Sequence, residues 1–364
     1  MRAGFPLSSA TTMNASAVTR FSAPLLMLLA ILIWAHPSVA ATYYVGSCKT
    51  GSYPTISEAV KQVPAGSTIK ICPGTYAEAL LIQKPLTLEG MRVGTSSQVI
   101  IQPPGVGSAL DSIKFGVVSP IIFADTGPVN LSDIIIAKTA CPTSLPLVDI
   151  FYSNAYGTIN HVTTQTSYCK AVDEIAILLE NGTSTATTTT VENSNIWEPQ
   201  DYGIYACSTP SRSVVNVKDN YVYYVANLGV AFDCNTAGTA TGNFGETAGL
   251  ATFAPGSVFS GNTLTQGAYG IYVSATGAKV ESNRIYNSGW PVFLYSDGAT
   301  VTGNKFMGGG PLNFNCFTAT VSGNTFVAGS IQGIGVGGYQ NAPASFKSSD
   351  MLFNVGTEYY GSCP

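Results

Sequence analysis

A short repeat between Gly256 and Tyr339 restricts the folds open to this chain. Four successive segments of about 21 residues read GSVFSGNTLTQGAYGIYVSAT, GAKVESNRIYNSGWPVFLYSD, GATVTGNKFMGGGPLNFNCFT and ATVSGNTFVAGSIQGIGVGGY. Each has an Asn after a small residue and, further on, two apolar residues two positions apart, such as Ile271 and Val273. A unit this short cannot bury its apolar residues alone, so its copies must stack on one another. The sequence therefore predicts a coil of β-strands.

The first forty residues have the pattern of a secretory signal peptide. Arg20 precedes an apolar run at 23–35, and residues 38–40 (Ser-Val-Ala) supply the small side chains that a signal peptidase requires. A membrane anchor is the alternative, but about thirteen apolar residues are few for a bilayer span. We expect residues 1–40 to be removed and the protein to be secreted, that is, extracellular or, in a bacterium, periplasmic.

Charge and composition argue against nucleic acid as a partner. Arg2 and Arg20 lie in the predicted signal peptide. Without them, 14 of the 16 Lys and Arg residues remain against 20 Asp and Glu residues, which gives a formal charge of −6. A chain this acidic, with no basic cluster, is not expected to bind phosphate backbones. The uniform repeat favours one elongated domain over residues 41–344, which we expect to be monomeric and to contact a membrane only through the signal peptide.

All eight cysteines lie in the predicted mature part of the chain. An even number of cysteines behind a signal peptide indicates disulfides, whereas zinc is disfavoured because no CxxC pair occurs. Cys207 and Cys234 follow equivalent apolar positions of neighbouring repeats, so we expect them to pair. The remaining expected pairs are Cys48–Cys72, Cys141–Cys169 and Cys316–Cys363.

The segment after residue 41 predicts a capped beginning to the coil. Thr55 and Glu58 have the spacing of a capping box, and the apolar residues that follow predict an amphipathic helix over 55–63 that closes the open end of the stack. The run YPTISEAVKQVPAGSTIKICPGTYAEALLIQKPLTLEG resembles the opening of right-handed parallel β-helix proteins of the pectate-lyase-like superfamily, including pectinesterases and bacterial β-helix repeat proteins. The resemblance implies an all-β, single-stranded right-handed parallel β-helix with three strands per coil. Residues 345–364 lack the repeat and are expected to form an irregular C-terminal cap.

The recurring asparagines are expected to be structural. Stacked amides can bond to one another and satisfy backbone groups at a bend, and this accounts for their pattern without a ligand. The column contains Asn220, Asn262, Asn283, Asn304 and Asn324, with Ser194 in the equivalent place.

Positions that alternate with the inward apolar pairs should point outward and are the candidates for ligand binding. They combine aromatic rings, which can stack on sugar faces, with amides that can bond to hydroxyl groups. Cross-strand packing of aromatic side chains is the alternative explanation. The candidate polysaccharide-binding residues are Tyr205, Tyr272, Phe293, Tyr295, Asn313 and Asn315.

Catalytic residues are harder to identify from this sequence. The superfamily resemblance implies that a uronate lyase or epimerase needs a basic residue near acids, often with calcium, and the candidates are Asp201, Arg212, Lys218 and Asp233. Two acids at 5 to 10 Å would instead suit hydrolysis, and Asp201 with Asp233 is the candidate pair. The QDTL, DFIFG and GRPW motifs of pectinesterases and the DD and GHG motifs of polygalacturonases are absent.

Two functional hypotheses follow from these patterns. In the first, a secreted β-helix binds polysaccharide and could process it by lyase- or epimerase-type chemistry; no cofactor is assigned, and calcium is the one left open. In the second, a non-catalytic surface or matrix protein uses the same scaffold. Ice or mineral binding would require regular Thr-x-Thr columns, which Thr302, Thr320 and Thr325 do not form.

Overall fold

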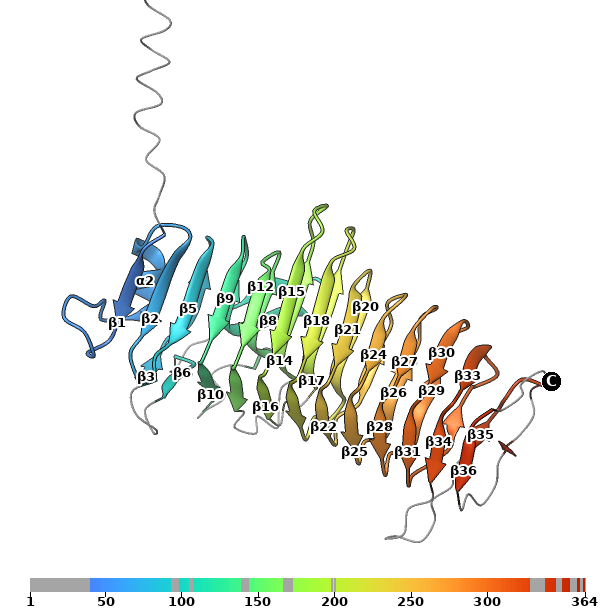
Figure 1. Ribbon diagram of the computed structural model, residues 1–364. Coiled ribbons are helices and arrows are strands. Elements are labelled where there is room, and N and C mark those ends of the chain that lie inside the picture. The colour runs from blue at the N-terminus through green and yellow to red at the C-terminus, as the bar shows by residue number, and fades with distance from the viewer. Residues whose placement is uncertain are drawn as a thin grey trace, which may run out of the picture. The chain divides into compact units, whose positions relative to one another are not determined.

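The computed structural model describes residues 40–92, 98–104, 108–138, 144–165, 173–197, 199, 201–327, 338–344, 349–353, 359–360 and 363. Residues 40–364 belong to one compact unit. The predicted signal peptide lies outside the described residues except for Ala40. Within the unit, the chain passes repeatedly through three parallel sheets, here named A, B and C, in that order (Figure 1).

Sheet A holds the strand that opens each coil. Its twelve described strands pair in parallel. They are β1 (Thr42–Val45), β2 (Ser67–Ile71), β5 (Leu86–Gly90), β9 (Val129–Ser132), β12 (Gly157–Asn160), β15 (Thr188–Glu192), β18 (Val214–Lys218), β21 (Ala237–Thr241), β24 (Val258–Ser260), β27 (Lys279–Glu281), β30 (Ala299–Thr302) and β33 (Ala319–Ser322).

Sheet B follows sheet A after a bend and is made of short strands. It has twelve described strands, also parallel. They are β3 (Gly74–Ala77), β6 (Val99–Gln102), β10 (Ile135–Ala137), β13 (Thr163–Gln165), β16 (Asn195–Trp197), β19 (Tyr221–Tyr223), β22 (Phe244–Glu246), β25 (Thr263–Thr265), β28 (Arg284–Tyr286), β31 (Lys305–Met307), β34 (Thr325–Val327) and β36 (Met351–Phe353).

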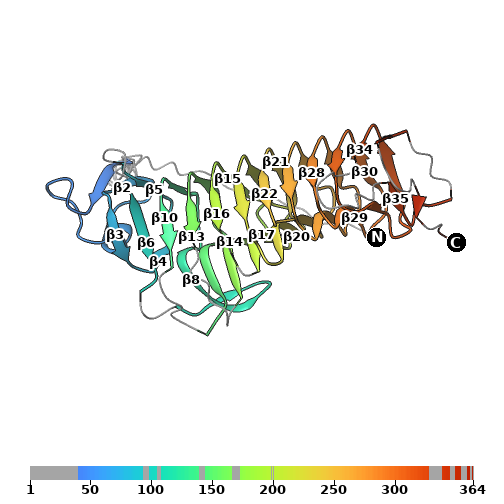
Figure 2. The same ribbon diagram turned by 90° about the horizontal axis from the view of Figure 1, so that it is seen from below.

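Sheet C completes each coil and carries the longest strands. All but one of its described strands are parallel to their neighbours; the exception, β7 (Leu110–Ser112), pairs antiparallel with β8. The parallel strands are β4 (Leu80–Ile82), β8 (Gly116–Ala124), β11 (Leu147–Ser153), β14 (Glu174–Asn181), β17 (Tyr202–Ser208), β20 (Leu228–Cys234), β23 (Leu250–Thr252), β26 (Tyr269–Val273), β29 (Trp290–Leu294), β32 (Leu312–Asn313), β35 (Tyr339–Gln340) and β37 (Tyr359–Tyr360). Figure 2 shows β8 and β14 on the side of the molecule where the sheet is widest.

These three sheets enclose one apolar core and confirm the right-handed parallel β-helix. Ile204 pairs in register with Val230, and Ile271 with Val292, so equivalent inward residues stack from coil to coil. All four are fully buried in the same central cluster. The period-2 alternation in the sequence therefore identified the inward side of sheet C correctly.

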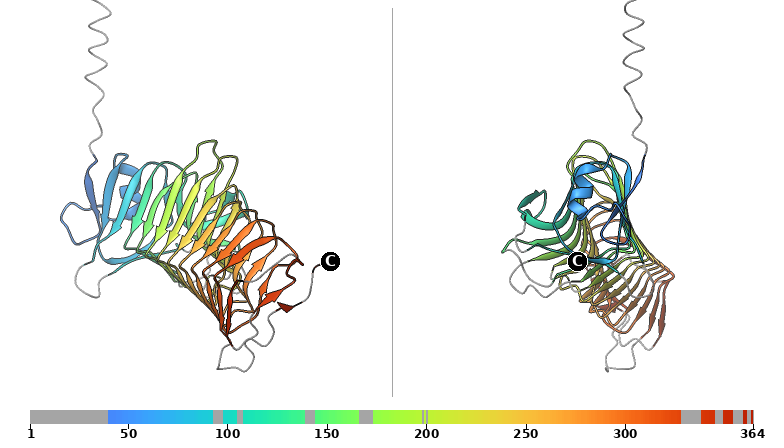
Figure 3. Two further views of the ribbon diagram at one scale, coloured as in Figure 1. Left: turned by 45° about the vertical axis from the view of Figure 1, so that its right-hand side comes forward. Right: turned by 90° about the vertical axis from the view of Figure 1, so that its left-hand side faces the viewer.

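One short helix begins the described fold, as predicted. Helix α2 (Ile56–Gln62) has Thr55 as its N-cap, whose hydroxyl oxygen accepts a hydrogen bond from the Glu58 amide. Ile56 and Val60 are buried in the central core, so the apolar face of α2 closes the first coils against water. Figure 3 shows α2 at the N-terminal end of the stack. At the other end, β36 and β37 extend sheets B and C into the segment expected to form the cap.

The asparagine column forms the predicted structural ladder. The Asn283 side-chain oxygen accepts from both the backbone and side-chain nitrogens of Asn262 at 2.9 Å, and its own Nδ2 donates to Asn304 at 3.0 Å. The same pattern links successive coils from Asn220 to Asn324 and includes Asn243, which the sequence analysis left out of the column. The column thus joins coils and does not present amides to a ligand.

Three of the four expected disulfides are present. Cys48 bonds to Cys72, Cys207 to Cys234 and Cys316 to Cys363. Cys207 and Cys234 lie on neighbouring coils with their Cα atoms 5.1 Å apart, as the repeat spacing predicted. The expected Cys141–Cys169 pair lies outside the described residues.

Candidate functional site

The outward side of sheet C is covered at its N-terminal half by a hairpin. Strand β7 turns into β8 through residues 113–115, and residues 112–115 are here called the hairpin tip. Phe115 packs edge-on against Tyr205, with ring centroids 4.8 Å apart, and also contacts Tyr202. A second apolar cluster therefore forms outside the coil, and Tyr205 lies within it.

This cover changes the role expected for Tyr205. The side chain does point outward, as predicted, but only 2% of the residue is exposed. Its ring faces Phe115 and is not open to a sugar. The sequence indicated which way the side chain points, but not that a distant segment covers it.

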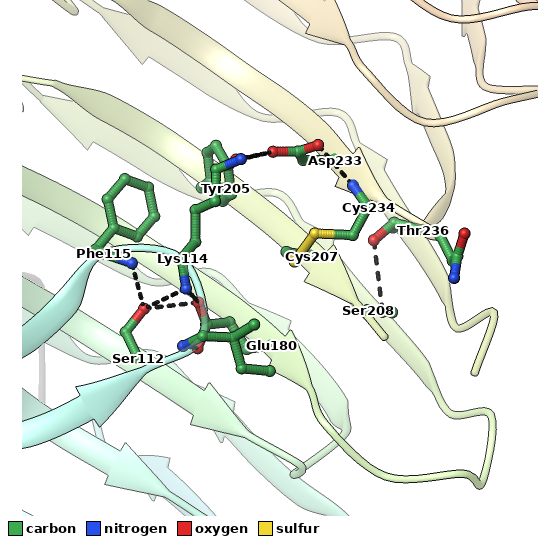
Figure 4. The surroundings of a disulfide bond; sticks show 12 residues. Ser112, Lys114, Phe115, Glu180, Tyr205, Cys207, Ser208, Asp233, Cys234 and Thr236 are labelled. Carbon is green, nitrogen blue, oxygen red and sulfur yellow. Dashed lines mark hydrogen bonds and ion pairs between the residues drawn. A yellow bond between two sulfur atoms is a disulfide. The ribbon is translucent and has the colours of Figure 1, made fainter. Parts of the chain in front are cut away.

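A polar cluster lies beneath the hairpin tip (Figure 4). Lys114 Nζ is 2.6 Å from Asp233 Oδ2, and the Tyr205 hydroxyl donates a hydrogen bond to the same oxygen. The Cys234 amide donates to Asp233 Oδ1 at 2.6 Å. Burial opposes ionisation of Asp233, but these donors outweigh it and hold the pKa of Asp233 below its ordinary value. Burial and the neighbouring Asp233 raise the pKa of Tyr205, so Asp233 is the anion and Tyr205 stays a donor.

Glu180 fixes the hairpin tip over this cluster. Its carboxylate accepts from Ser112 Oγ at 2.7 Å, from the Ile113 amide at 2.7 Å and from the Lys114 amide at 3.1 Å. Glu180 is buried, and burial raises its pKa although these hydrogen bonds pull it down. Register places Glu180, Cys207 and Asp233 in one outward row across three coils. The tip therefore supplies donors to both carboxylates of the row.

Of the four predicted catalytic residues, Asp233 alone lies in this cluster. Lys218 ends β18 in sheet A, 3.5 Å from Asp219, and Arg212 donates to the Pro255 carbonyl at 3.0 Å in the loop after β17. Asp201 directly precedes β17. It lies six residues before Cys207, which pairs in register with Asp233, so roughly 20 Å along the strand direction separates Asp201 from Asp233.

Asp201 has a separate environment at that end of sheet C. It accepts from Asn227 Nδ2 at 3.0 Å, and burial raises its pKa, with the nearby Asp173 adding to the effect. With this backbone separation, Asp201 and Asp233 are not arranged as the close pair considered for hydrolysis.

Lys114 is the charged residue that the sequence analysis missed. It lies 119 positions before Asp233, in a stretch with no repeat or motif. Gly116, with φ of 69°, gives the only local signal, since a glycine turn between apolar runs is compatible with a hairpin.

Beyond the hairpin tip, the outward side of sheet C becomes a continuous aromatic surface, here called the aromatic platform. Tyr272 and Phe293 stack with centroids 5.6 Å apart and an interplanar angle of 8°. Phe293 and Tyr295 are also nearly parallel, at 14°. The exposed fractions are 38% for Phe253, 37% for Tyr269 and 51% for Tyr295. The platform consists of Phe253, Tyr269, Tyr272, Trp290, Phe293, Tyr295 and Phe317.

Three of the predicted ligand-binding residues thus lie on the platform: Tyr272, Phe293 and Tyr295. Asn313 is 5% exposed and its Oδ1 accepts from the Asn315 amide at 2.8 Å, so it serves the turn; Asn315 is half-buried. Tyr269 and Trp290 were missed because each lies three positions before Tyr272 or Phe293, where strict alternation would turn the side chain inward. The alternation is interrupted at Gly270 and Pro291, each of which is buried beside the next buried residue of its strand.

Sheet B carries a second, smaller aromatic row made of Trp197, Tyr221, Tyr223 and Phe244. Trp197 and Tyr223 stack with centroids 4.3 Å apart and an interplanar angle of 19°. Tyr221 is 49% exposed. This row follows the spacing of adjacent strands and lies on a different sheet from the platform, so it offers a matched control.

The corner between sheets B and C contains a buried ion cluster formed by Lys138, Asp149 and Glu174. Lys138 Nζ is 2.8 Å from Asp149 Oδ1 and also pairs with Glu174, and all three side chains are fully buried. Burial is the main cause that raises the pKa of Asp149 to about 7, and Glu174 adds to it while Lys138 opposes it. The cluster is closed to solvent and is best explained as structural.

Among the described residues, no three His, Cys, Asp or Glu side chains lie close enough together to hold a metal ion. Calcium therefore has no assigned ligands, and its involvement stays a prediction. In the part of the chain that the structure describes, no helix is long and apolar enough to cross a membrane.

Comparison with known families agrees with this architecture. The family described as "Right handed beta helix region" matches residues 176–361, just over half of the chain. The chain therefore belongs to the right-handed β-helix family. A comparison with curated proteins found no match.

Several solved structures share the fold at low sequence identity. XylC in complex with xylose has 9% identity and a TM-score of 0.55 over 86% of this chain and 86% of that one. The catalytic domain of Agl-KA has 12% identity and a TM-score of 0.51, over 83% and 62%. The GH136 lacto-N-biosidase from Eubacterium ramulus has 12% identity and a TM-score of 0.50, over 88% and 68%. At these identities the likeness establishes the fold alone.

Proposed function

We propose that this is a secreted protein that binds a polysaccharide along the aromatic platform of sheet C. The observation that carries the proposal is the unbroken series of outward rings, of which Phe253, Tyr269 and Tyr295 are each more than a third exposed. Such a surface is costly to leave in water unless it has a ligand. Tyrosine and tryptophan combine an apolar ring with a polar group, which suits a ligand that has apolar faces and hydroxyl edges.

Two further observations support this role. XylC, which has the same fold, was solved with xylose, and another structural neighbour is named a lacto-N-biosidase, so carbohydrate is associated with this scaffold elsewhere. Three disulfides agree with an oxidising compartment, as the signal-like residues 1–40 also suggest. The protein is proposed to act as an extracellular monomer.

Binding can be tested with variants of the platform against a matched variant elsewhere. Soluble polysaccharides are run in affinity electrophoresis, and the dissociation constant of any that bind is measured by calorimetry. Tyr295→Ala and Phe253→Ala should each weaken binding about tenfold, since an exposed stacking ring at a binding surface contributes on the order of 1–2 kcal/mol. Tyr221→Ala removes an equally exposed ring from sheet B and should leave affinity unchanged. Equal losses in all three variants, or no binding by the wild type, would refute the proposal.

A second candidate function, processing of the bound polysaccharide, is favoured by the charged cluster at the end of the platform. Asp233 is ionised, partly exposed and bordered by two donors, Lys114 and Tyr205. A stabilised carboxylate can act as a nucleophile or stabilise a positively charged transition state. The lyase- or epimerase-type chemistry expected from the sequence needs a basic residue to take the C5 proton of a uronate, and Lys114, the basic residue of this cluster, is held in an ion pair with Asp233.

Activity is tested by incubating wild-type protein with each polysaccharide that binds and measuring new reducing ends and unsaturated products. Asp233→Asn should reduce turnover at least about a hundredfold while leaving binding to the platform within about threefold. Asp219→Asn, an exposed acid on another side of the coil, is the control. Absence of any turnover by the wild type would support the non-catalytic surface or matrix protein instead.

A further inference from the structure

The charges around the aromatic platform indicate which class of polysaccharide it accepts. Every residue from 201 to 327 is described, and this stretch includes all seven platform rings. It contains five basic residues, none of which is on a strand of sheet C. Lys218 and Lys279 belong to sheet A, Arg284 and Lys305 to sheet B, and Arg212 to the loop after β17.

Carboxylates, in contrast, border the platform at two points. Asp297 follows β29 and accepts from the Thr318 amide and hydroxyl, each at 2.7 Å. These hydrogen bonds lower the pKa of Asp297, so it carries its negative charge throughout the neutral range. Asp233 borders the other end, and its charge is paired with Lys114, whose Nζ is 2.6 Å away.

The negative charges of Asp233 and Asp297 would therefore repel a uronate polymer placed on this surface. Such a polymer carries a negative charge on every sugar, and proteins that bind polyanions place Lys and Arg along the path. Here the path offers rings, Ser274 and Asn315, with negative charge at its borders. The platform spans three coil spacings, roughly 14 Å, so several charged sugars would lie on it without a cation from the fully described stretch 201–327.

We infer that the ligand of the platform is a neutral polysaccharide, an inference that rests on the proposed binding function. A neutral ligand also limits the reactions that Asp233 could catalyse. Elimination and C5 epimerisation both require a carboxyl group, ionised or esterified, next to the carbon that loses its proton, so neither can act on a chain of neutral sugars that has no such group. If Asp233 has a catalytic role, the reaction consistent with this ligand is hydrolysis of a glycosidic bond, in which water adds across the C–O bond and the leaving oxygen gains a proton.

The test compares each neutral polysaccharide that binds with its own C6-oxidised derivative, which has the same backbone but a carboxylate on the sugars. Polygalacturonate and alginate are included with and without calcium. At low ionic strength the oxidised derivative should bind at least tenfold more weakly than its neutral parent. Added salt should narrow this difference, because it screens the charge repulsion.

A variant separates charge from shape. Asp297→Asn keeps the acceptor for Thr318 and removes a charge, so it should strengthen binding of the oxidised derivative and leave the neutral parent unchanged. The inference is overturned if oxidised derivatives bind as tightly as their parents, or if only the uronate polymers bind. Absence of binding by every polymer would instead overturn the proposed function itself.

Discussion

Replacing one rung of the asparagine ladder should destabilise the coil by several kcal/mol. In Asn283→Ala the Asn262 amide loses its acceptor at 2.9 Å, and the Phe259 carbonyl loses the donor Nδ2, also at 2.9 Å. The side-chain contacts to Asn262 and Asn304 disappear as well. Stranding a buried N–H costs about 1–3 kcal/mol, and each further hydrogen bond is worth about 1 kcal/mol net. Because Asn262 and Asn304 keep other partners, we expect a total loss of roughly 3–5 kcal/mol.

The assay is urea unfolding followed by circular dichroism and tyrosine fluorescence, together with hydrogen exchange. Asn235→Ala is the matched control, since Asn235 is exposed and makes only one side-chain hydrogen bond, at 3.4 Å to Pro210. It should change the free energy of unfolding by less than about 0.5 kcal/mol. In a stacked repeat the damage spreads to nearest neighbours, so amides of β24, β27 and β30 should exchange faster in Asn283→Ala. If the unfolding free energy of Asn283→Ala stays within about 1 kcal/mol of that of Asn235→Ala, the asparagine ladder does not stabilise the coil as we expect.

Three other predictions concern the buried charges and the cover over sheet C. The pKa of Asp149 is raised to about 7 in the folded protein. Between about pH 4 and pH 7 the folded state therefore keeps a proton on Asp149 that the unfolded chain has released. The free energy of unfolding should fall as the pH rises through this range. Asp149→Asn should flatten that slope, by at most about 4 kcal/mol across the range, in urea titrations at several pH values; an unchanged slope would contradict this. Replacing Cys207 and Cys234 together with Ser should cost about 3 kcal/mol relative to the oxidised wild type, whose other disulfides the variant keeps; a stability equal to the oxidised wild type would contradict it. Phe115→Ala should increase oxidation of Tyr205 in hydroxyl-radical footprinting, identified by mass spectrometry, and protection equal to wild type would show that Phe115 is not the cover.

The repeat in the sequence was sufficient to predict the β-helix, because each coil follows the same backbone path. The inward pairs, the asparagine ladder and the Cys207–Cys234 bond all depend on which residues occupy equivalent positions, and a repeat of about 21 residues specifies that directly. The direction of Tyr272, Phe293 and Tyr295 followed from the same alternation, since successive strand residues point to opposite faces.

The cover over sheet C could not be predicted in this way. Lys114 and Asp233 are far apart in sequence, and their ion pair depends on how the hairpin folds back, which no periodic pattern encodes. The position of Lys218 was different in this respect. It falls in a coil adjacent to the acids but flanks the asparagine column, which predicts a different side of the coil from Asp233, and the structure places it at the end of β18 in sheet A.

The position of the hairpin tip has a physical explanation in the row of outward residues beneath it. Glu180 and Asp233 are two coils apart, roughly 10 Å, and an uncovered sheet would leave both carboxylates with few donors. The tip provides two amides and a hydroxyl to Glu180 and an ammonium group to Asp233, while Phe115 adds apolar contact. The carboxylates of Glu180 and Asp233 therefore determine where the tip packs, and burial of the Phe115 ring contributes much of the favourable free energy of packing. The scaffold repeats the same backbone path at every coil, and the hairpin tip brings Lys114 to Asp233, which makes this end of the platform chemically different from the rest.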